Sequence, residues 1–198
     1  MSNVRARSRN VLTGLVVIAV LLCALSASAQ TRPNLNNNFQ SPVTIQITTG
    51  TGPNAQTVEG VGQITFDFTA QMERQFYTFD DAPPINIVTR ADLGKMYTVN
   101  PPTCEVQEIT ELAPLFGFVA QAKQGPPDEV NGIQGTTWVS SQTDPTITLL
   151  ATNDGTTPLY YQVATAGQTE RIIFLNFQTT FNLKPNLFKV PGQCLRQN

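Results

Sequence analysis

The sequence predicts an all-β domain built from antiparallel strands, and three observations support this prediction. Short runs alternate apolar and polar side chains, as half-buried strands do. Clusters of Gly, Pro, Asn and Asp separate these runs, where tight turns are expected. Only residues 112–123 space their apolar side chains as a helix does. Because no helices alternate with the strands, we expect either two packed antiparallel sheets or a barrel-like shell.

The elements follow from local patterns along the chain. The expected strands are residues 43–48, 63–68, 72–79, 85–89, 95–99, 105–109, 135–140, 146–151, 159–164 and 170–181. Pro83 and Pro84 end one of them, because proline cannot donate a hydrogen bond to a sheet. Residues 170–181 form the longest expected strand. Residues 112–123 are expected to form a short helix, since Pro114 suits a first helical turn.

The N-terminal segment has the features of a secretory signal peptide. Three arginines precede an apolar run over residues 11–25, and Ala27-Ser28-Ala29 provides a small-residue cleavage pattern. A membrane-spanning helix is the alternative, but it needs about 20 apolar residues. The expected organisation is a signal peptide over 1–29, a disordered leader over 30–40 and a single β domain over 41–198. We therefore expect a secreted, extracellular protein.

The charge of the mature chain excludes several classes of partner. Three of the twelve Lys and Arg lie in the signal peptide, so nine oppose fourteen Asp and Glu, a net charge of about −5. The basic residues do not cluster, so nucleic acid is not an expected partner. No later segment is apolar enough to span a bilayer, so we expect no stable membrane anchor. No Asn-x-Ser/Thr sequon occurs, so N-glycosylation is not expected.

The absence of histidine and the small number of cysteines limit the chemistry. Without histidine, Ser-His-Asp and Cys-His sites and histidine metal ligands are excluded. Cys23 lies in the signal peptide, which leaves Cys104 and Cys194. In an exported protein these two are expected to form a disulfide, and two free reactive thiols are the alternative.

Paired carboxylates are the remaining common means of acid–base catalysis. The candidates considered are Asp67, Glu73, Asp80, Asp81, Glu105, Glu108 and Glu111. No spacing singles out a catalytic pair, and several of them suit turns or an exposed face. We therefore expect no catalytic residues and no enzyme activity. No calcium-loop pattern occurs, so no metal or other cofactor is expected, although calcium bound by turn carboxylates is left open.

Several short motifs occur in the order typical of the ependymin-related proteins. They are Gly62–Asp67, Glu73–Tyr77, Gly94–Val99 shortly before Cys104, the single Trp138, Arg171–Phe181 and the ending Pro185–Cys194. The chain resembles this family over residues 62–194. It departs from the family at Thr157, which precedes Pro158 where many animal members carry a cysteine. It also lacks the glycosylation sites of many members.

The resemblance implies a fold and a function. The implied fold is two antiparallel sheets in a half-open, barrel-like shell similar to lipoprotein carriers, with at most one or two short helices. It also implies that Cys104 pairs with Cys194. The implied activity is the binding of a lipid or another hydrophobic molecule in a deep pocket, without catalysis. Calcium binding is known for some members, but no calcium ligands can be transferred to this chain.

The aromatic residues on the expected strands allow two interpretations. They can fill an ordinary sheet core, which is the simpler one, or line a cavity in a curved sheet. The leading hypothesis is a carrier of hydrophobic ligands. Its expected pocket residues are Ile64, Phe66, Phe68, Phe76, Met96, Trp138, Ile173, Leu175 and Phe177. The alternative is a matrix or adhesion protein without a cavity, consistent with the low charged fraction of 13%. A homodimer is left open.

Overall fold

The computed structural model describes residues 31–140, 142, 144–180 and 182–196. The chain divides into two units, Met1–Thr31 and Arg32–Asn198. All described secondary structure belongs to the second unit. The predicted signal peptide, residues 1–29, lies outside the described residues. No helix among the described residues is both long and apolar enough to cross a membrane.

Strands account for most of the second unit, and the described residues contain no α-helix. The strands are β1 (Asn38–Thr49), β2 (Gln56–Asp67), β3 (Met72–Phe79), β4 (Ile85–Arg90), β5 (Lys95–Asn100), β6 (Thr103–Glu108), β7 (Lys123–Val130), β8 (Ile133–Val139), β9 (Thr146–Thr152), β10 (Pro158–Ala164), β11 (Gln168–Phe174) and β12 (Gln178–Thr179). Short 3-10 helices connect some of them: η1 (Gly52–Asn54), η2 (Ala91–Leu93), η3 (Gly117–Gln121), η4 (Pro185–Phe188) and η5 (Cys194–Arg196).

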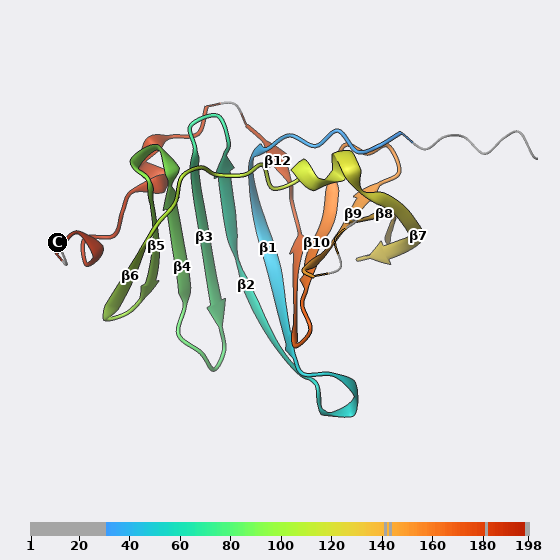
Figure 1. The fold of residues 1–198 in the computed structure, drawn as a ribbon, viewed down its shortest axis with the longest axis horizontal. Coiled ribbons are helices and arrows are strands. Elements are labelled where there is room, and N and C mark those ends of the chain that lie inside the picture. The colour runs from blue at the N-terminus through green and yellow to red at the C-terminus, as the bar shows by residue number, and fades with distance from the viewer. Residues whose placement is uncertain (1–30, 141, 143, 181, 197–198) are drawn as a thin grey trace, which may run out of the picture. The chain divides into compact units, whose positions relative to one another are not determined.

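The strands form one open, curled antiparallel sheet (Figure 1). Its strand order is β6-β5-β4-β3-β2-β1-β11-β10-β9-β8-β7, and β12 pairs with β1. This confirms the predicted all-β antiparallel class, although the strands belong to one sheet rather than two. At Gly62 in β2, an added Cβ would lie 2.0 Å from the carbonyl oxygen of Phe76 in β3. Glycine is therefore needed there for the close approach of the two strands.

The two faces of the sheet bury different residues. We call inner the face that carries Val43 and Ile45 of β1, and outer the opposite face. The inner face holds the main apolar cluster, which reaches from Tyr77 in β3 to Trp138 in β8. The outer face holds two smaller clusters. One surrounds the Cys104–Cys194 disulfide, whose sulfurs are 2.00 Å apart, and this confirms the predicted pairing.

Several element predictions were wrong, each for an identifiable physical reason. The expected strand over 170–181 ends as β11 at Phe174, and only two later residues pair with β1 as β12. The expected helix over 112–123 is irregular apart from η3, since Gly117 and Val119 are poor helix formers. The expected disordered leader 30–40 runs into β1 at Asn38. Phe39 is 0% exposed there, so apolar burial outweighs the polar composition around it.

Strand β7 was not predicted, because Pro126 and Pro127 argue against a strand. It is an edge strand whose pairing with β8 shifts between Gln124 and Pro127, where the missing amide hydrogens are tolerated. Asn131 and Gly132 connect β7 to β8 with φ of 53° and 77°. These positive values are those of a tight hairpin turn. The Asn-Gly pair was therefore the sequence signal for this hairpin.

Candidate functional site

The inner face of the sheet holds the largest of the three apolar clusters formed by the described residues. Register aligns its residues across the strands: Ile45 of β1 opposes Gly60 of β2 and Ile172 of β11, and Val43 opposes Phe174. The buried members of this cluster come from six strands, from the connection between β6 and β7, and from the residues before β1. They are Leu35, Phe39, Val43, Ile45, Ile64, Phe66, Tyr77, Phe116, Val119, Ala122, Trp138, Leu149, Ala151, Ile172 and Phe174.

Phe39 lies at the centre of an aromatic group on this face. Its ring stacks on Phe66 with 5.7 Å between centroids, and the ring of Phe177 lies 4.8 Å away. Phe116 and Phe174 complete the group at 5.7 and 6.0 Å. Such offset and edge-to-face contacts add to the stabilisation that burial alone provides. The group joins four separate parts of the chain: β1, β2, the β6–β7 connection and the end of β11.

Residues 112–122, which we call the cover segment, close the inner face. They run from β6 across the sheet to β7, as the yellow-green chain in Figure 1 shows. Phe116, Val119 and Ala122 are buried in the apolar cluster, whereas Leu115 and Phe118 are only half-buried against it. The inner face is therefore closed by irregular chain instead of a second layer of secondary structure: the cover segment contributes most of it, and Leu35 before β1 and Phe177 after β11 contribute the rest.

Side chains, rather than a backbone ladder, connect the cover segment to the rest of the unit. The Phe116 amide donates to Asn37 Oδ1 at 3.1 Å, and the Leu112 amide donates to Gln71 Oε1 at 2.9 Å. Arg32 Nη1 donates to the carbonyl oxygens of Val119 and Ala120, both at 2.7 Å. Among the described residues, the backbone–backbone bonds of the segment stay within its own turns. Segments bonded in this way open at lower free-energy cost than strands in a ladder.

The arginine that holds the cover segment also contacts the sheet. The guanidinium carbon of Arg32 lies 6.0 Å from the centroid of the Trp138 ring. Arg32 thus joins the end of the cover segment to the buried tryptophan of β8 through hydrogen bonds and a cation–π contact.

A hydrogen-bonded group of polar side chains interrupts the apolar inner face. Tyr77 Oη donates to Gln75 Oε1 at 2.9 Å, and Gln75 Nε2 donates to Glu73 Oε1 at 2.7 Å. Thr89 Oγ1 donates to the other oxygen of Glu73 at 3.4 Å. Burial raises the pKa of Glu73 above its ordinary value of 4.5, because the charged form is poorly solvated there. Burial, followed by the charge of Glu170, raises the pKa of Tyr161 to about 12.

These groups do not form a recognised catalytic arrangement. The carboxylate of Glu73 is hydrogen-bonded to an amide and a hydroxyl, and no second carboxylate shares those contacts in the described part of the chain. Within the same residues, no group of three or more His, Cys, Asp or Glu could hold a metal ion.

The predicted pocket residues do not form one group. Ile64, Phe66 and Trp138 lie in the inner cluster, and Phe177 packs against it. Met96 of β5 opposes Thr89, which opposes Glu73, so it belongs to the inner face of the sheet.

The other predicted residues lie elsewhere. Ile173 is buried in an outer cluster with Leu150, Leu159 and Tyr160, and Leu175 is 53% exposed beyond the end of β11. Phe68 follows β2 and is 36% exposed. Phe76 is on the outer face. The alternation in β11 was recognised, but its register with β1 turns Ile172 and Phe174 inward instead of Ile173.

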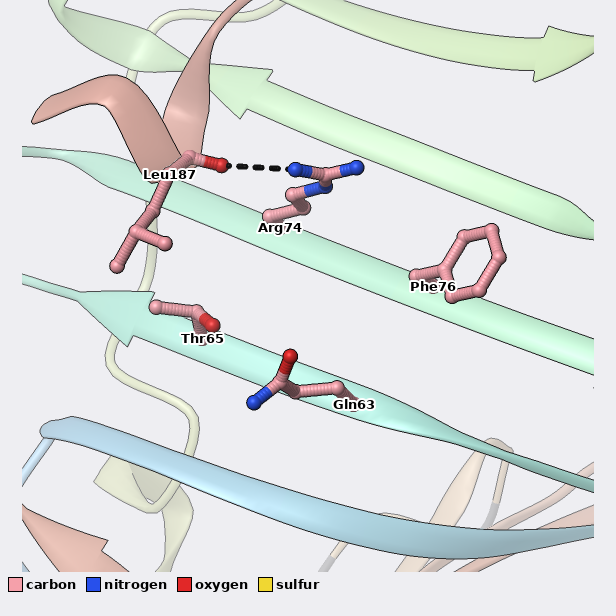
Figure 2. A pocket seen from close by; sticks show the side chains of 5 residues that line it. All are labelled: Gln63, Thr65, Arg74, Phe76 and Leu187. Atoms are coloured by element: carbon pink, nitrogen blue, oxygen red, sulfur yellow. Dashed lines mark hydrogen bonds between the residues drawn. The ribbon is translucent and has the colours of Figure 1, made fainter.

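A small cavity of about 130 Å³ lies on the outer face between β2, β3 and η4. Figure 2 shows the residues that line it: Gln63, Thr65, Arg74, Phe76 and Leu187. It contains one of the predicted pocket residues, Phe76, together with an arginine that the sequence did not single out. The inner face and this cavity are on opposite sides of the sheet, so they are separate sites.

The candidate-site residues that the sequence did not point to are Phe39 on the inner face and Phe116 and Phe118 in the cover segment. Phe39 follows three asparagines, so it was assigned to the leader. Phe116 and Phe118 fell in the expected helix. The one available signal was that Phe116 and Phe118 give an otherwise irregular connection two large apolar side chains, which need a surface to cover.

Comparisons with known proteins found similarity in chain path alone. No family model matches the chain, and no curated protein sequence matches it significantly. Among solved structures, lipoprotein LppX from Mycobacterium tuberculosis is similar with a TM-score of 0.45 and 8% identity, covering 86% of this chain and 99% of that one. LprF from Mycobacterium bovis gives 0.40 and 9%, covering 74% and 89%. A LolA superfamily protein from Nitrosomonas europaea gives 0.38 and 8%, covering 82% and 94%.

These findings correct the resemblance drawn from the sequence motifs. The resemblance to the ependymin-related proteins was wrong, since no family model matches and the similar structures are lipoprotein LppX, LprF and a LolA superfamily protein. The quoted motifs are short strands and turns that many β proteins share. With TM-scores below 0.5, the function has to be argued from the residues of this chain.

Proposed function

We propose that the protein binds a lipid or another hydrophobic molecule between the inner face of the sheet and the cover segment, without catalysis. The observation that carries this proposal is the way the inner face is closed. A wide apolar surface centred on Phe39, Phe66 and Phe174 is covered by irregular chain, mainly the cover segment, which is tied through the side chains of Asn37, Gln71 and Arg32.

An apolar face of a sheet can be covered permanently or by a segment that opens. A permanent core is normally closed by a second layer whose own backbone is paired. Here the half-buried side chains of Leu115 and Phe118 contact the cluster from a segment that can separate from it at modest cost. An acyl chain or similar group could then replace the contacts of these side chains with the sheet. The predicted signal peptide supports a role outside the cytoplasm.

The test measures the binding of a dansyl-labelled fatty acid to the purified protein through the change in dansyl fluorescence. Phe118 contacts Tyr161 with ring centroids 6.1 Å apart and lies on the cover segment. We expect Phe118→Ser to weaken binding of the probe about tenfold, because it removes part of the apolar surface that the cover segment offers to a ligand. Phe68→Ser is the matched control, since Phe68 is 36% exposed and belongs to neither the inner cluster nor the outer cavity, so the affinity should stay unchanged.

Two results would contradict the proposal. One is the absence of saturable probe binding together with the absence of lipid in organic extracts of the natively purified protein, measured by mass spectrometry. The other is an equal effect of both substitutions on probe affinity. A lipid-free protein that forms oligomers readily would favour the matrix or adhesion alternative.

A further inference from the structure

The cavity on the outer face combines a cationic group with an apolar wall. It lies over two cross-strand pairs, Gln63 with Phe76 and Thr65 with Arg74, and Leu187 of η4 closes one side. Figure 2 shows the Arg74 guanidinium directed along the sheet towards Leu187, with the ring of Phe76 on the other side of the opening. Residues far apart in the chain, 63–76 and 187, thus form one concave surface.

The guanidinium of Arg74 has only neutral partners. Nη1 donates to the carbonyl oxygen of Leu187 at 3.3 Å, and Nε donates to Asn86 Oδ1 at 3.4 Å. Both distances are at the long end for hydrogen bonds between N–H and oxygen. In the described part of the chain, no carboxylate forms an ion pair with Arg74, and its remaining N–H groups are available. A half-buried cation without a counter-ion favours an anion beside it.

Two further polar groups line the cavity without partners of their own. Among the described residues, neither the Thr65 hydroxyl nor the Gln63 amide hydrogen-bonds to another side chain or to the backbone, and since no buried side-chain N or O atom lacks a partner, both are open to solvent. Each can therefore donate to a bound oxygen. The ring of Phe76, 37% exposed, and the side chain of Leu187 provide the apolar part of the lining.

We propose that this cavity binds a small organic carboxylate, with the carboxylate group on Arg74 and Thr65 and a short apolar part against Phe76 and Leu187. A guanidinium matches the two oxygens of a carboxylate through parallel hydrogen bonds. A single unpaired arginine suits one negative charge better than the two of a phosphate. The volume of about 130 Å³ is close to that of cavities that hold benzene, about six heavy atoms, which is the size of butyrate.

The experiment is isothermal titration calorimetry of the full mature chain with butyrate, butyramide and inorganic phosphate. We expect saturable binding of butyrate and at least about tenfold weaker binding of butyramide, which has the same shape without the charge. Arg74→Gln should weaken butyrate binding by a similar factor. Arg171→Gln is the matched control, because Arg171 is another half-buried arginine bonded to an amide oxygen, that of Gln162.

Other results separate this site from the inner face and from simpler explanations. If Arg74→Gln does not fold, Phe76→Ser replaces it as the test variant and should weaken butyrate binding, whereas Phe118→Ser should not. Butyrate that binds no better than butyramide would overturn the proposal. So would phosphate binding as tightly as butyrate, because the apolar wall would then contribute nothing. Loss of fatty-acid binding at the inner face would not affect these outcomes.

Discussion

Glu73 is the residue whose environment most constrains how stability depends on pH. It is 8% exposed on the inner face, and burial raises its pKa. The pKa of Glu170 is also raised by burial. For both groups the protonated form is favoured by folding. Their contribution to stability is therefore complete below the ordinary pKa of 4.5 and is lost as the pH rises through the folded-state pKa.

We therefore expect the free energy of unfolding, measured with urea, to fall as the pH rises above 4.5. The slope for one proton can reach about 1.4 kcal/mol per pH unit. Glu73→Gln should make the slope shallower, because glutamine does not titrate, its oxygen can still accept from Gln75, and its NH2 group can donate to the Thr89 hydroxyl. Asp92→Asn is the control. Hydrogen bonding to Arg90 lowers the pKa of Asp92 below 3.8, so its loss should leave the slope above pH 4.5 unaltered. Equal slopes for wild type and Glu73→Gln would contradict this account of the inner face.

The Cys104–Cys194 disulfide is a second feature by which single residues determine the stability of the protein. Cys104 and Cys194 are 90 residues apart in sequence, and both are buried beside Val88 and Val190. On the chain-entropy model, closing a loop of this length stabilises the protein by about 4–5 kcal/mol. We expect Cys104→Ser with Cys194→Ser to lower the free energy of unfolding by roughly that amount, and either single change to cost nearly as much. A loss below about 1 kcal/mol would mean that packing alone holds the C-terminal segment on β5 and β6.

At the scale of elements, the cover segment is expected to be the least stable part of the inner site. Asn37→Ala removes the acceptor of the Phe116 amide at the start of η3. One such hydrogen bond contributes about 1 kcal/mol, so the amides of the cover segment should exchange with solvent about fivefold faster. The amides of the β1–β2 ladder should be unaffected, which the same hydrogen-exchange experiment records. Asn86→Ala, which removes a side-chain amide on the outer face, should change the exchange rates neither of the cover segment nor of the β1–β2 ladder. Slow exchange throughout the cover segment of Asn37→Ala would show that it is a permanent part of the core.

The elements that the sequence predicted best are those whose periodicity is local. The expected strand over 72–79 coincides with β3, and 146–151 differs from β9 by one residue. The cover segment, β7 and the end of β11 could not be predicted in this way, because each is decided by what lies beside it. The cover segment follows the shape of the inner face, and the residues after Phe174 leave the ladder so that Phe177 can reach Phe39. These are tertiary effects that override local propensity.

At the scale of the second unit, the sheet separates two kinds of surface. The inner face is apolar with one buried polar chain of hydrogen bonds, whereas the outer cavity combines Arg74 with polar and apolar groups. Alternation along β2 predicted that Ile64 and Phe66 share a face, and the structure agrees. It could not tell which residues of β11 share that face, since a shift of one residue in register reverses every side chain. Candidate site residues on different strands therefore needed the pairing of the strands, which a single sequence does not contain.

The most direct test of a ligand site on the inner face uses Trp138. It is the only tryptophan in the chain, it is 4% exposed, and it belongs to the inner cluster. Bromine atoms quench tryptophan fluorescence only at contact distance, so a brominated fatty acid reports whether a ligand reaches this face. We predict saturable quenching by the brominated acid and none by its unbrominated parent. Binding of the brominated acid with unchanged Trp138 fluorescence would contradict the account.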